Sequence, residues 1–164
     1  MSLDLNALKE NIQTLFQDAN TTTASVPLSN GLTTKVQEIY KINPARISIQ
    51  ATNYPFVTIY ISNKQIENAD IARTQANAKR KAEIDVKVVG ATFNSIYTNI
   101  DEDAADDECE DLMENIEQIL RNNPTLSNFA TWSYPTAVEY HSTQLDEQSI
   151  VRAGMLSLKT VVFY

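Results

Sequence analysis

The chain has 164 residues, 43% of them hydrophobic and 21% charged, which fits one globular domain with a core of its own. Its net charge of −8 argues against a protein that wraps DNA by neutralising phosphates, and its three glycines form no phosphate-binding loop. The single cysteine excludes an intrachain disulfide and a zinc site built on several cysteines. Because the sequence shows no secretory signal and no long apolar run, we expect a soluble protein with no membrane partner, made in a reducing compartment.

The first third of the chain predicts a helix, a loop and the start of a sheet. Apolar residues at helical spacing predict an amphipathic helix over residues 3–16, and turn-forming residues predict a loop over 19–34. Residues 36–42 fit more than one structure. Alternating apolar and polar residues predict a strand at 46–50, and a run of β-branched and aromatic residues predicts another at 56–61.

Residues 62–82 lead from that strand to a further strand at 83–88, and their pattern predicts a projecting arm. A structureless loop of this length would be unusual. Mostly alanines hold one parity and polar residues hold the other, which predicts a long β-hairpin whose tip extends beyond the core. The alanines also permit a short helix, and an irregular surface loop is the plainer alternative. An arm without large apolar residues cannot stabilise itself alone, so it needs a partner or stays mobile.

A second feature is the concentration of acid in one segment. Ten acidic side chains lie between residues 101 and 117, where there is no lysine or arginine. Apolar residues at helical spacing from 105 to 120 predict an amphipathic helix, which the sequence at 122–124 ends. The positions of oxygen-bearing side chains and glycine do not match a calcium-binding EF-hand loop. The acids are therefore interpreted as a solvated face, and the alternative is a face that repels an anionic partner.

After the acidic helix the chain predicts two more strands. Residues 137–141 and 155–164 are typical of strands, and the polar residues 142–149 between them predict a turn or a second hairpin tip. The order is helix, several antiparallel strands, helix, two strands. It predicts an α+β fold over residues 1–164, with a mixed, mostly antiparallel sheet covered on one face by two helices.

The sequence predicts no catalytic, cofactor or metal site. His141 has no acid at a spacing known from a catalytic site, and Cys109 falls on the predicted core face of the acidic helix. The aromatic residues do not alternate with a basic patch, as a nucleic-acid stacking platform requires. Solvated acids also lack the apolar surroundings that separate the pKa values of catalytic carboxyls. An alternative from another class is a small ligand-binding module or enzyme with a pocket near Trp132, Tyr140 and His141.

Five stretches together carry a resemblance of order and pattern over nearly the whole chain, without a catalytic signature. They are Asn-Tyr-Pro-Phe-Val-Thr-Ile-Tyr at 53–60, the polar hairpin leading to Ala-Glu-Ile-Asp-Val-Lys-Val-Val at 82–89, the acidic helix ending in Ile119-Leu120, Asn-Pro-Thr-Leu-Ser at 123–127, and the closing strand at 153–164. The N-terminal amphipathic helix fits as well. In this order of features the chain resembles the phage tail terminator family, the lambda-like minor tail protein U group.

The resemblance implies a structural virion protein and no enzyme. It implies a small α/β subunit that assembles into a six-membered ring on the tail tube, stops tube polymerisation and presents a surface for the head or neck. Its partners would be other copies of the chain, the tail tube protein and a head-completion or neck protein, at the head-proximal end of the tail in the virion, after assembly in the host cytoplasm. DNA would pass through the ring without specific binding, and no cofactor is implied. A head-completion or neck connector protein of similar size is the alternative.

In that role, two features of opposite sign are candidate contacts between subunits. A closed ring joins two different edges of each subunit, which must complement each other. An acidic surface could instead line the channel, where it would repel DNA phosphate. The basic candidates, all in the arm, are Lys64, Arg73, Lys79, Arg80 and Lys81. The candidate acidic face is Asp103, Asp106, Asp107, Glu110, Asp111 and Glu114.

Overall fold

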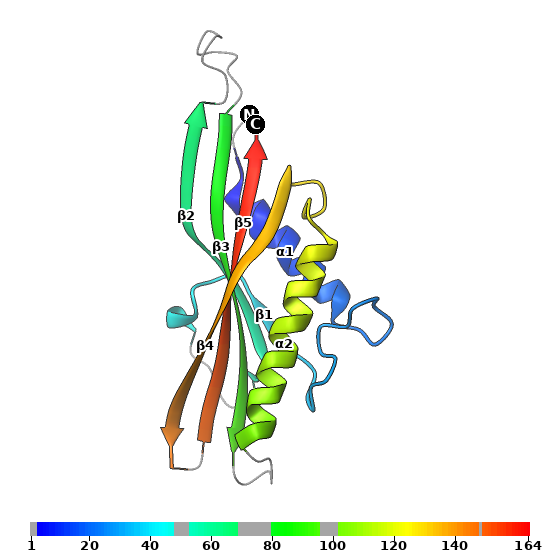
Figure 1. Ribbon diagram of the computed structural model, residues 1–164, viewed down its shortest axis with the longest axis vertical. Coiled ribbons are helices and arrows are strands. Elements are labelled where there is room, and N and C mark those ends of the chain that lie inside the picture. The colour runs from blue at the N-terminus through cyan, green and yellow to red at the C-terminus, as the bar shows by residue number, and fades with distance from the viewer. Residues whose placement is uncertain (1–2, 48–52, 69–79, 96–101, 148) are drawn as a thin grey trace.

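The computed structural model describes residues 3–47, 53–68, 80–95, 102–147 and 149–164. The molecule is elongated, because its long strands run along one axis (Figure 1). In chain order the elements are α1 (Leu5–Ala19), β1 (Glu38–Tyr40), the 3-10 helix η1 (Pro44–Arg46), β2 (Phe56–Asn68), β3 (Arg80–Ser95), α2 (Glu102–Asn122), β4 (Trp132–Asp146) and β5 (Ser149–Phe163).

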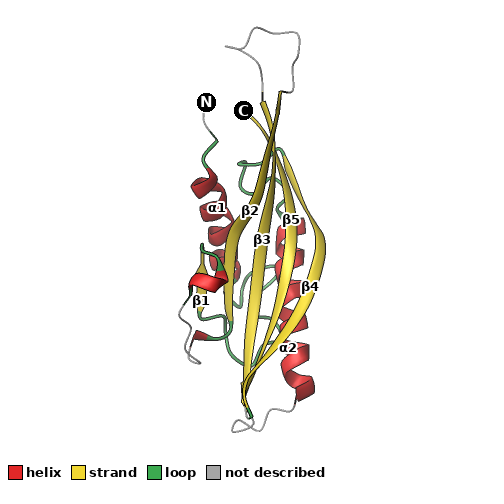
Figure 2. Ribbon diagram, turned by 90° about the vertical axis from the view of Figure 1, so that its left-hand side faces the viewer, coloured by secondary structure: helices red, strands yellow, loops and turns green. Residues whose placement is uncertain are grey.

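The five strands form one sheet in the order β1-β2-β3-β5-β4. β1 lies parallel to β2, and the other neighbouring pairs are antiparallel. α1 and α2 lie on the same side of the sheet, which we name the covered face, and the opposite side is the open face (Figure 2). This arrangement confirms the predicted α+β fold with a mixed, mostly antiparallel sheet and two helices on one face.

The core lies between the covered face and the apolar sides of the two helices. α1 begins after Asp4, whose carboxylate accepts hydrogen bonds from amides of the first turn. Its fully buried side chains recur every four residues, at Leu8, Ile12 and Phe16. The predicted apolar side of α2 is confirmed from residue 109 onward, and the side chain of Ala105 lies outside the described residues. The buried members are Cys109, Leu112, Met113, Ile116, Ile119 and Leu120.

α2 packs against the sheet at a point where two strands carry glycines opposite each other. Gly90 of β3 pairs with Gly154 of β5, and Met113 of α2 lies against both. A Cβ atom on Gly154 would lie 2.3 Å from Met113 Cγ, and one on Gly90 would lie 2.9 Å from the Met113 sulfur. The two glycines therefore allow a close approach of the helix to the backbone of the sheet.

The predicted loop between α1 and β1 is attached to α2 by a buried amide. Asn115 Nδ2 donates hydrogen bonds to the carbonyl oxygens of Leu28, at 3.0 Å, and of Asn30, at 2.8 Å. The next residue, Gly31, has a φ of 82°, a left-handed conformation that suits glycine. This turn places the loop directly beside Asp111 of α2.

The segment before β2 differs from the sequence prediction. The ambiguous residues 36–42 contain β1, whose three residues lie parallel to the start of β2. The strand predicted at 46–50 is wrong at its two described residues, because Arg46 belongs to η1 and Ile47 ends that helix. That short helix begins at Pro44, and the side chain of Asn43 accepts a hydrogen bond that caps it. Residues 48–50 lie outside the described residues.

The predicted hairpin is confirmed as far as the pair Asn68–Arg80, and residues 69–79 lie outside the described part of the chain. Its stem belongs to the sheet, because β5 pairs with β3 as far as Phe163 opposite Lys81. β4 and β5 are longer than predicted, so the turn between them is short and lies between Asp146 and Ser149.

Candidate subunit interface

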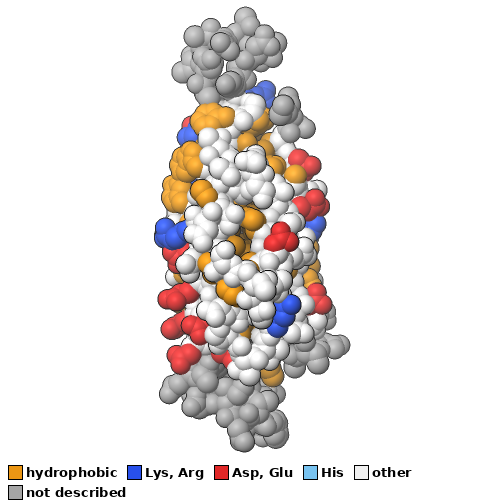
Figure 3. All heavy atoms as spheres, turned by 90° about the vertical axis from the view of Figure 1, so that its right-hand side faces the viewer, with side chains coloured by type: hydrophobic (Ala, Val, Ile, Leu, Met, Phe, Trp, Pro, Cys, Tyr) orange, Lys and Arg blue, Asp and Glu red, His pale blue; other side chains and the backbone are white. Residues whose placement is uncertain are grey.

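The predicted acidic face of α2 divides into an outer strip and an inner group. Asp107, Glu110 and Glu114 are exposed, and we name them the acidic strip. Seen from the side on which α2 lies, Asp and Glu side chains gather along one flank of the lower half of the molecule (Figure 3). The side chain of Asp103 lies outside the described residues. The strip is the part of the predicted face that is available to a partner.

The inner group, Asp106 and Asp111, contacts other residues of the same subunit. Arg152 Nε of β5 lies 2.6 Å from Asp106 Oδ1, an ion pair in which the N–H is poorly aimed for a hydrogen bond. Asp111 lies against the backbone of Gly31, and the neighbouring Glu108 accepts a hydrogen bond of 2.9 Å from the amide of Thr33. These acids therefore fix α2 to β5 and to the loop.

Tyr140 of β4 lies beside the acidic strip. The pKa of its phenol is raised, first by partial burial and then by the negative charge of carboxylates on α2, which are Glu110, Glu114 and Glu117. Half of its side chain is nevertheless exposed. The Cys109 thiol is buried, and burial raises its pKa to about 11, so it is a poor nucleophile at neutral pH. Tyr140 of β4 and the carboxylates of α2 together form a surface with an exposed aromatic ring beside negative charge.

The basic candidates fall into three groups. Arg73 and Lys79 lie outside the described residues. Lys64 on β2 is half-buried and Arg80 at the start of β3 is exposed, and neither forms an ion pair with another residue that the structure describes. Lys81 differs from both, because it is bound within the subunit.

Lys81 belongs to a network of charges on the open face. Its Nζ lies 2.5 Å from Glu83 Oε1 and 3.6 Å from Glu67 Oε2, and Lys159 Nζ lies 2.9 Å from Glu83 Oε2. The hydrogen bonds from Lys81 and Lys159 lower the pKa of Glu83 to about 2. Lys81 is therefore a weaker candidate for a subunit contact than Lys64 or Arg80, since a partner would compete with Glu83 for it.

The structure brings together only two of the three residues of the ligand-binding alternative. Tyr140 and His141 of β4 line a cavity of about 250 Å³ together with residues of α2 and β5, but Trp132 does not line it. Trp132 stacks on Tyr134, with ring centroids 5.1 Å apart. His141 Nε2 lies 3.8 Å from Glu139 Oε2, and both side chains are about two-thirds exposed. Among the described residues, no three His, Cys, Asp or Glu side chains are grouped so that they could hold a metal ion.

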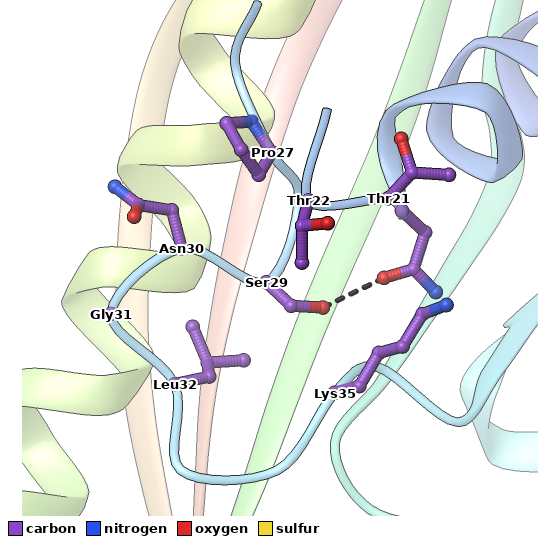
Figure 4. Close-up of a pocket in the computed structure, with 9 residues that line it drawn as sticks. Thr21, Thr22, Pro27, Ser29, Asn30, Gly31, Leu32 and Lys35 are labelled. Atoms are coloured by element: carbon purple, nitrogen blue, oxygen red, sulfur yellow. Dashed lines mark hydrogen bonds between the residues drawn. The ribbon is translucent and has the colours of Figure 1, made fainter. Parts of the chain in front are cut away.

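A larger cavity, of about 370 Å³, lies in the loop between α1 and β1 (Figure 4). Its polar groups bind one another: Ser29 Oγ donates to Asn20 Oδ1 at 2.7 Å and accepts from the amide of Val36 at 2.9 Å. Lys35 is the one charged side chain in its lining. The hydrogen bonds hold the loop together and bring no pair of reactive groups face to face.

Sequence reasoning missed the two outer margins of the sheet. β4 has a neighbour on one side, and six successive residues, 139–144, are exposed. On the other margin, β1 pairs with β2 only over Phe56–Thr58. A signal for the first margin was present in the sequence, because Pro135 lies inside β4 and proline is confined to edge positions of sheets.

No family model and no curated protein matches the sequence. Among solved structures, a chain of a particle described as "Virion of native gene transfer agent (GTA) particle" aligns with a TM-score of 0.38 and 9% sequence identity. The alignment covers 96% of this chain and 98% of that chain. At this level of similarity the match assigns no family. Neither helix in the described residues is long and apolar enough to cross a lipid bilayer.

Proposed function

We propose that this chain is a structural subunit of a phage-like virion, a tail terminator that forms a ring on the tail tube. The ring stops further polymerisation of the tube and presents the attachment surface for the head or neck. The observation that carries the proposal is the presence of two unlike exposed margins on one elongated sheet. Closed rings of identical subunits need such a pair, because each subunit gives one margin to each neighbour.

The charges on the two margins are complementary. The acidic strip and Tyr140 lie on the margin formed by α2 and β4. Lys64 lies on β2, at the other margin, and Arg80 lies on the neighbouring strand β3; neither has an acidic partner in the described residues. Opposite charges favour the correct contact and disfavour contact between two equal margins. The sequence resemblance to tail terminators supports the same role, and it supplies the expected copy number of six.

The overall charge of −8 suits a ring through which DNA moves. Negative charge on a channel wall repels phosphate, so DNA passes without being trapped. In this proposal the chain carries out no reaction and holds no cofactor. The partners are copies of itself, the tail tube protein and a head-completion or neck protein, in the head-proximal part of the tail.

The test is a binding and length assay with purified tail tubes. Electron micrographs should show the protein as a ring at one end of each tube, and tubes that polymerise in its presence should stop at a defined length. Tubes that grow equally with and without the protein, and that carry none of it, would contradict the proposal.

A pull-down distinguishes a tail terminator from the alternative, a head-completion or neck connector protein. A tail terminator binds the tube protein, whereas a head-completion or neck connector binds the portal side and leaves the tube free. Capture of the portal protein without capture of the tube protein would favour the connector.

A further inference from the structure

We infer that neighbouring subunits join by extending their sheets, so that the outer edge of β4 pairs antiparallel with the outer edge of β2 in a second copy of this chain. The inference rests on the proposed function, since it names the surface by which the ring would close. It depends on four observations: two free edges, matching backbone positions, compatible strand directions and complementary side chains.

Both edges are free in the subunit. β4 pairs only with β5, and β2 pairs only with β3 after its first three residues, so each has one unpaired side among the described residues (Figure 2). A long exposed edge with unpaired N–H and C=O groups is a template for another strand, and monomeric proteins usually cover or interrupt such edges. Here the exposed run at 139–144 is neither covered nor interrupted.

On the outer edges of β4 and β2, the backbone N–H and C=O groups that point outward belong to residues whose side chains lie on the same face of the sheet. Arg80 and Tyr164 exchange both backbone hydrogen bonds, which fixes the alternation of bonded pairs across β2, β3, β5 and β4. By that alternation, the N–H and C=O groups of Tyr140 and Ser142 point away from β5, and those of Lys64 and Ile66 point away from β3. All four side chains lie on the covered face, so direct pairing of these residues continues the covered face from one copy into the next.

The strand directions also fit. Each strand in the series β2, β3, β5, β4 is antiparallel to the one before it, so β4 runs opposite to β2. In a ring whose axis follows the strands, rotation from one copy to the next preserves their directions. β4 therefore meets the β2 of its neighbour in the antiparallel sense, which is the more stable pairing.

The side chains at these positions complement each other. Ile66 and Tyr140, 52% and 51% exposed, are the two most exposed large apolar side chains in the described residues, and each lies on one of the two edges. Lys64 lies two positions from Ile66, and the carboxylates of Glu110 and Glu114 lie near Tyr140. Pairing would bury the two apolar side chains together and bring Lys64 toward the acidic strip. Because both complementary edges belong to this chain, we expect the strand that pairs with each edge to come from a second copy of it.

Pro135 sets one limit of the pairing. It occupies a position of β4 whose nitrogen points away from β5, and its ring nitrogen has no hydrogen to donate. The partner strand therefore pairs with the part of β4 that follows Pro135. That part contains the exposed run 139–144 and Tyr140.

Disulfide trapping tests the inference. Cysteine at His141 on β4 is combined in turn with cysteine at Asn63, Gln65 or Glu67 on β2. These residues direct their backbone hydrogen bonds into their own subunit, so between two copies they would form the non-hydrogen-bonded pairs, whose Cα atoms lie closest. Because the three positions sample different registers, at least one combination should give a ladder of covalent multimers under mild oxidation. The matched control combines cysteine at Gln65 with cysteine at the exposed Gln118 of α2 and should give monomers.

A pair of proline variants gives the second readout. Ser142→Pro removes an N–H that points away from the subunit, so its melting temperature should stay close to that of the original chain while ring assembly is lost. Thr143→Pro removes an N–H that points toward β5, so it should lower the melting temperature itself.

The outcomes separate this inference from the proposed function. One outcome is that native mass spectrometry shows rings although none of the three cysteine combinations cross-links and Ser142→Pro assembles fully. That result would overturn the edge pairing and leave the proposed terminator function intact. Cross-links from β4 to the tube protein instead of to a second copy would also overturn it. Absence of rings, both alone and with tubes, would overturn both.

Discussion

Gly154 decides how closely α2 can lie against the sheet. Its absent Cβ leaves the space that Met113 occupies, and the same holds for Gly90 on the neighbouring strand. Protein cores are packed so densely that an added methyl group at such a point must displace its neighbour. The position is therefore more sensitive to substitution than its small side chain suggests.

We predict that Gly154→Ala lowers the free energy of unfolding by about 1–3 kcal/mol, because the new methyl group overlaps Met113. Urea denaturation measures the change. In the double variant with Met113→Ala the overlap is gone, so the two effects should not add. Simple additivity would show that the contact between Gly154 and Met113 is not the cause.

Glu83 is predicted to make stability depend on acid. Its folded-state pKa of about 2 lies below the ordinary value of 4.5, owing to Lys81 and Lys159. A lowered folded pKa contributes stability that is fully present above 4.5 and is lost as the pH falls toward 2. The melting temperature of Glu83→Gln should thus lie below that of the original chain at neutral pH, and the two should converge as the pH falls through this window.

Asp107→Asn is the matched control for Glu83→Gln, because it removes an exposed carboxylate with no ion-pair partner in the described residues. Its melting temperature should follow that of the original chain across the same pH range. A constant difference between Glu83→Gln and the original chain at every pH would contradict the role of the two lysines.

At the scale of elements, the loop after α1 depends on one side chain of α2. Asn115 is 8% exposed and supplies the hydrogen bonds to two loop carbonyls. Buried carbonyl groups that lose their donors cost free energy, and a buried charge facing them costs more. The loop and the helix therefore act as one structural unit.

We predict that Asn115→Asp lowers the free energy of unfolding by about 3 kcal/mol, because a carboxylate replaces the donor and faces two carbonyl oxygens. Gln118→Glu makes the same amide-to-acid change on the exposed side of α2 and should have an effect below about 0.5 kcal/mol. Thermal or urea unfolding of both variants checks the comparison. Equal losses would show that added charge on α2, and not the loop contact, is responsible.

Elements with a strong local pattern could be predicted from the sequence, and those set by distant contacts could not. α2 follows from its helical spacing and its stop at 122–124, and the hairpin of β2 and β3 follows from alternation. β1 is three residues long and exists because it lies beside β2, so nothing local marks it. The attachment of the loop to Asn115 joins residues 85 and 87 positions apart.

The candidate interface was predictable only in part for the same reason. The acidity of residues 106–114 is visible in the sequence, but their division into an exposed strip and internal ion pairs depends on where β5 and the loop lie. The free edges of β4 and β2 depend on strand order, which no single segment encodes. Lys81 looked like Lys64 in the sequence. Glu83 lies two residues along the same strand, and the register adds Glu67, which faces Lys81 from β2.

For the whole molecule, the charges predict how assembly responds to salt. The acidic strip and Lys64 lie on opposite margins and would meet only between copies. An exposed ion pair contributes about 0–1 kcal/mol and is screened by salt. Because a ring repeats the contact at every interface, a small contribution at each becomes measurable in the assembly as a whole.

We predict that Lys64→Glu raises the protein concentration needed for half-assembly at low salt, and that the difference from the original chain shrinks at high salt. Combining it with Glu114→Lys restores opposite charges and should recover part of the assembly. Lys35→Glu, in the loop, is the control with the same change of charge and should leave assembly unaffected. Sedimentation velocity measures all four proteins, and failure of the combined variant to recover any assembly would remove this pair from the interface.

The claim that this chain works by forming a closed ring of identical copies is tested most directly by native mass spectrometry, alone at high concentration and with purified tail tubes. We expect a single closed species of six copies, present on tubes and at high protein concentration. A chain that stays monomeric under both conditions and does not bind the tubes would contradict it.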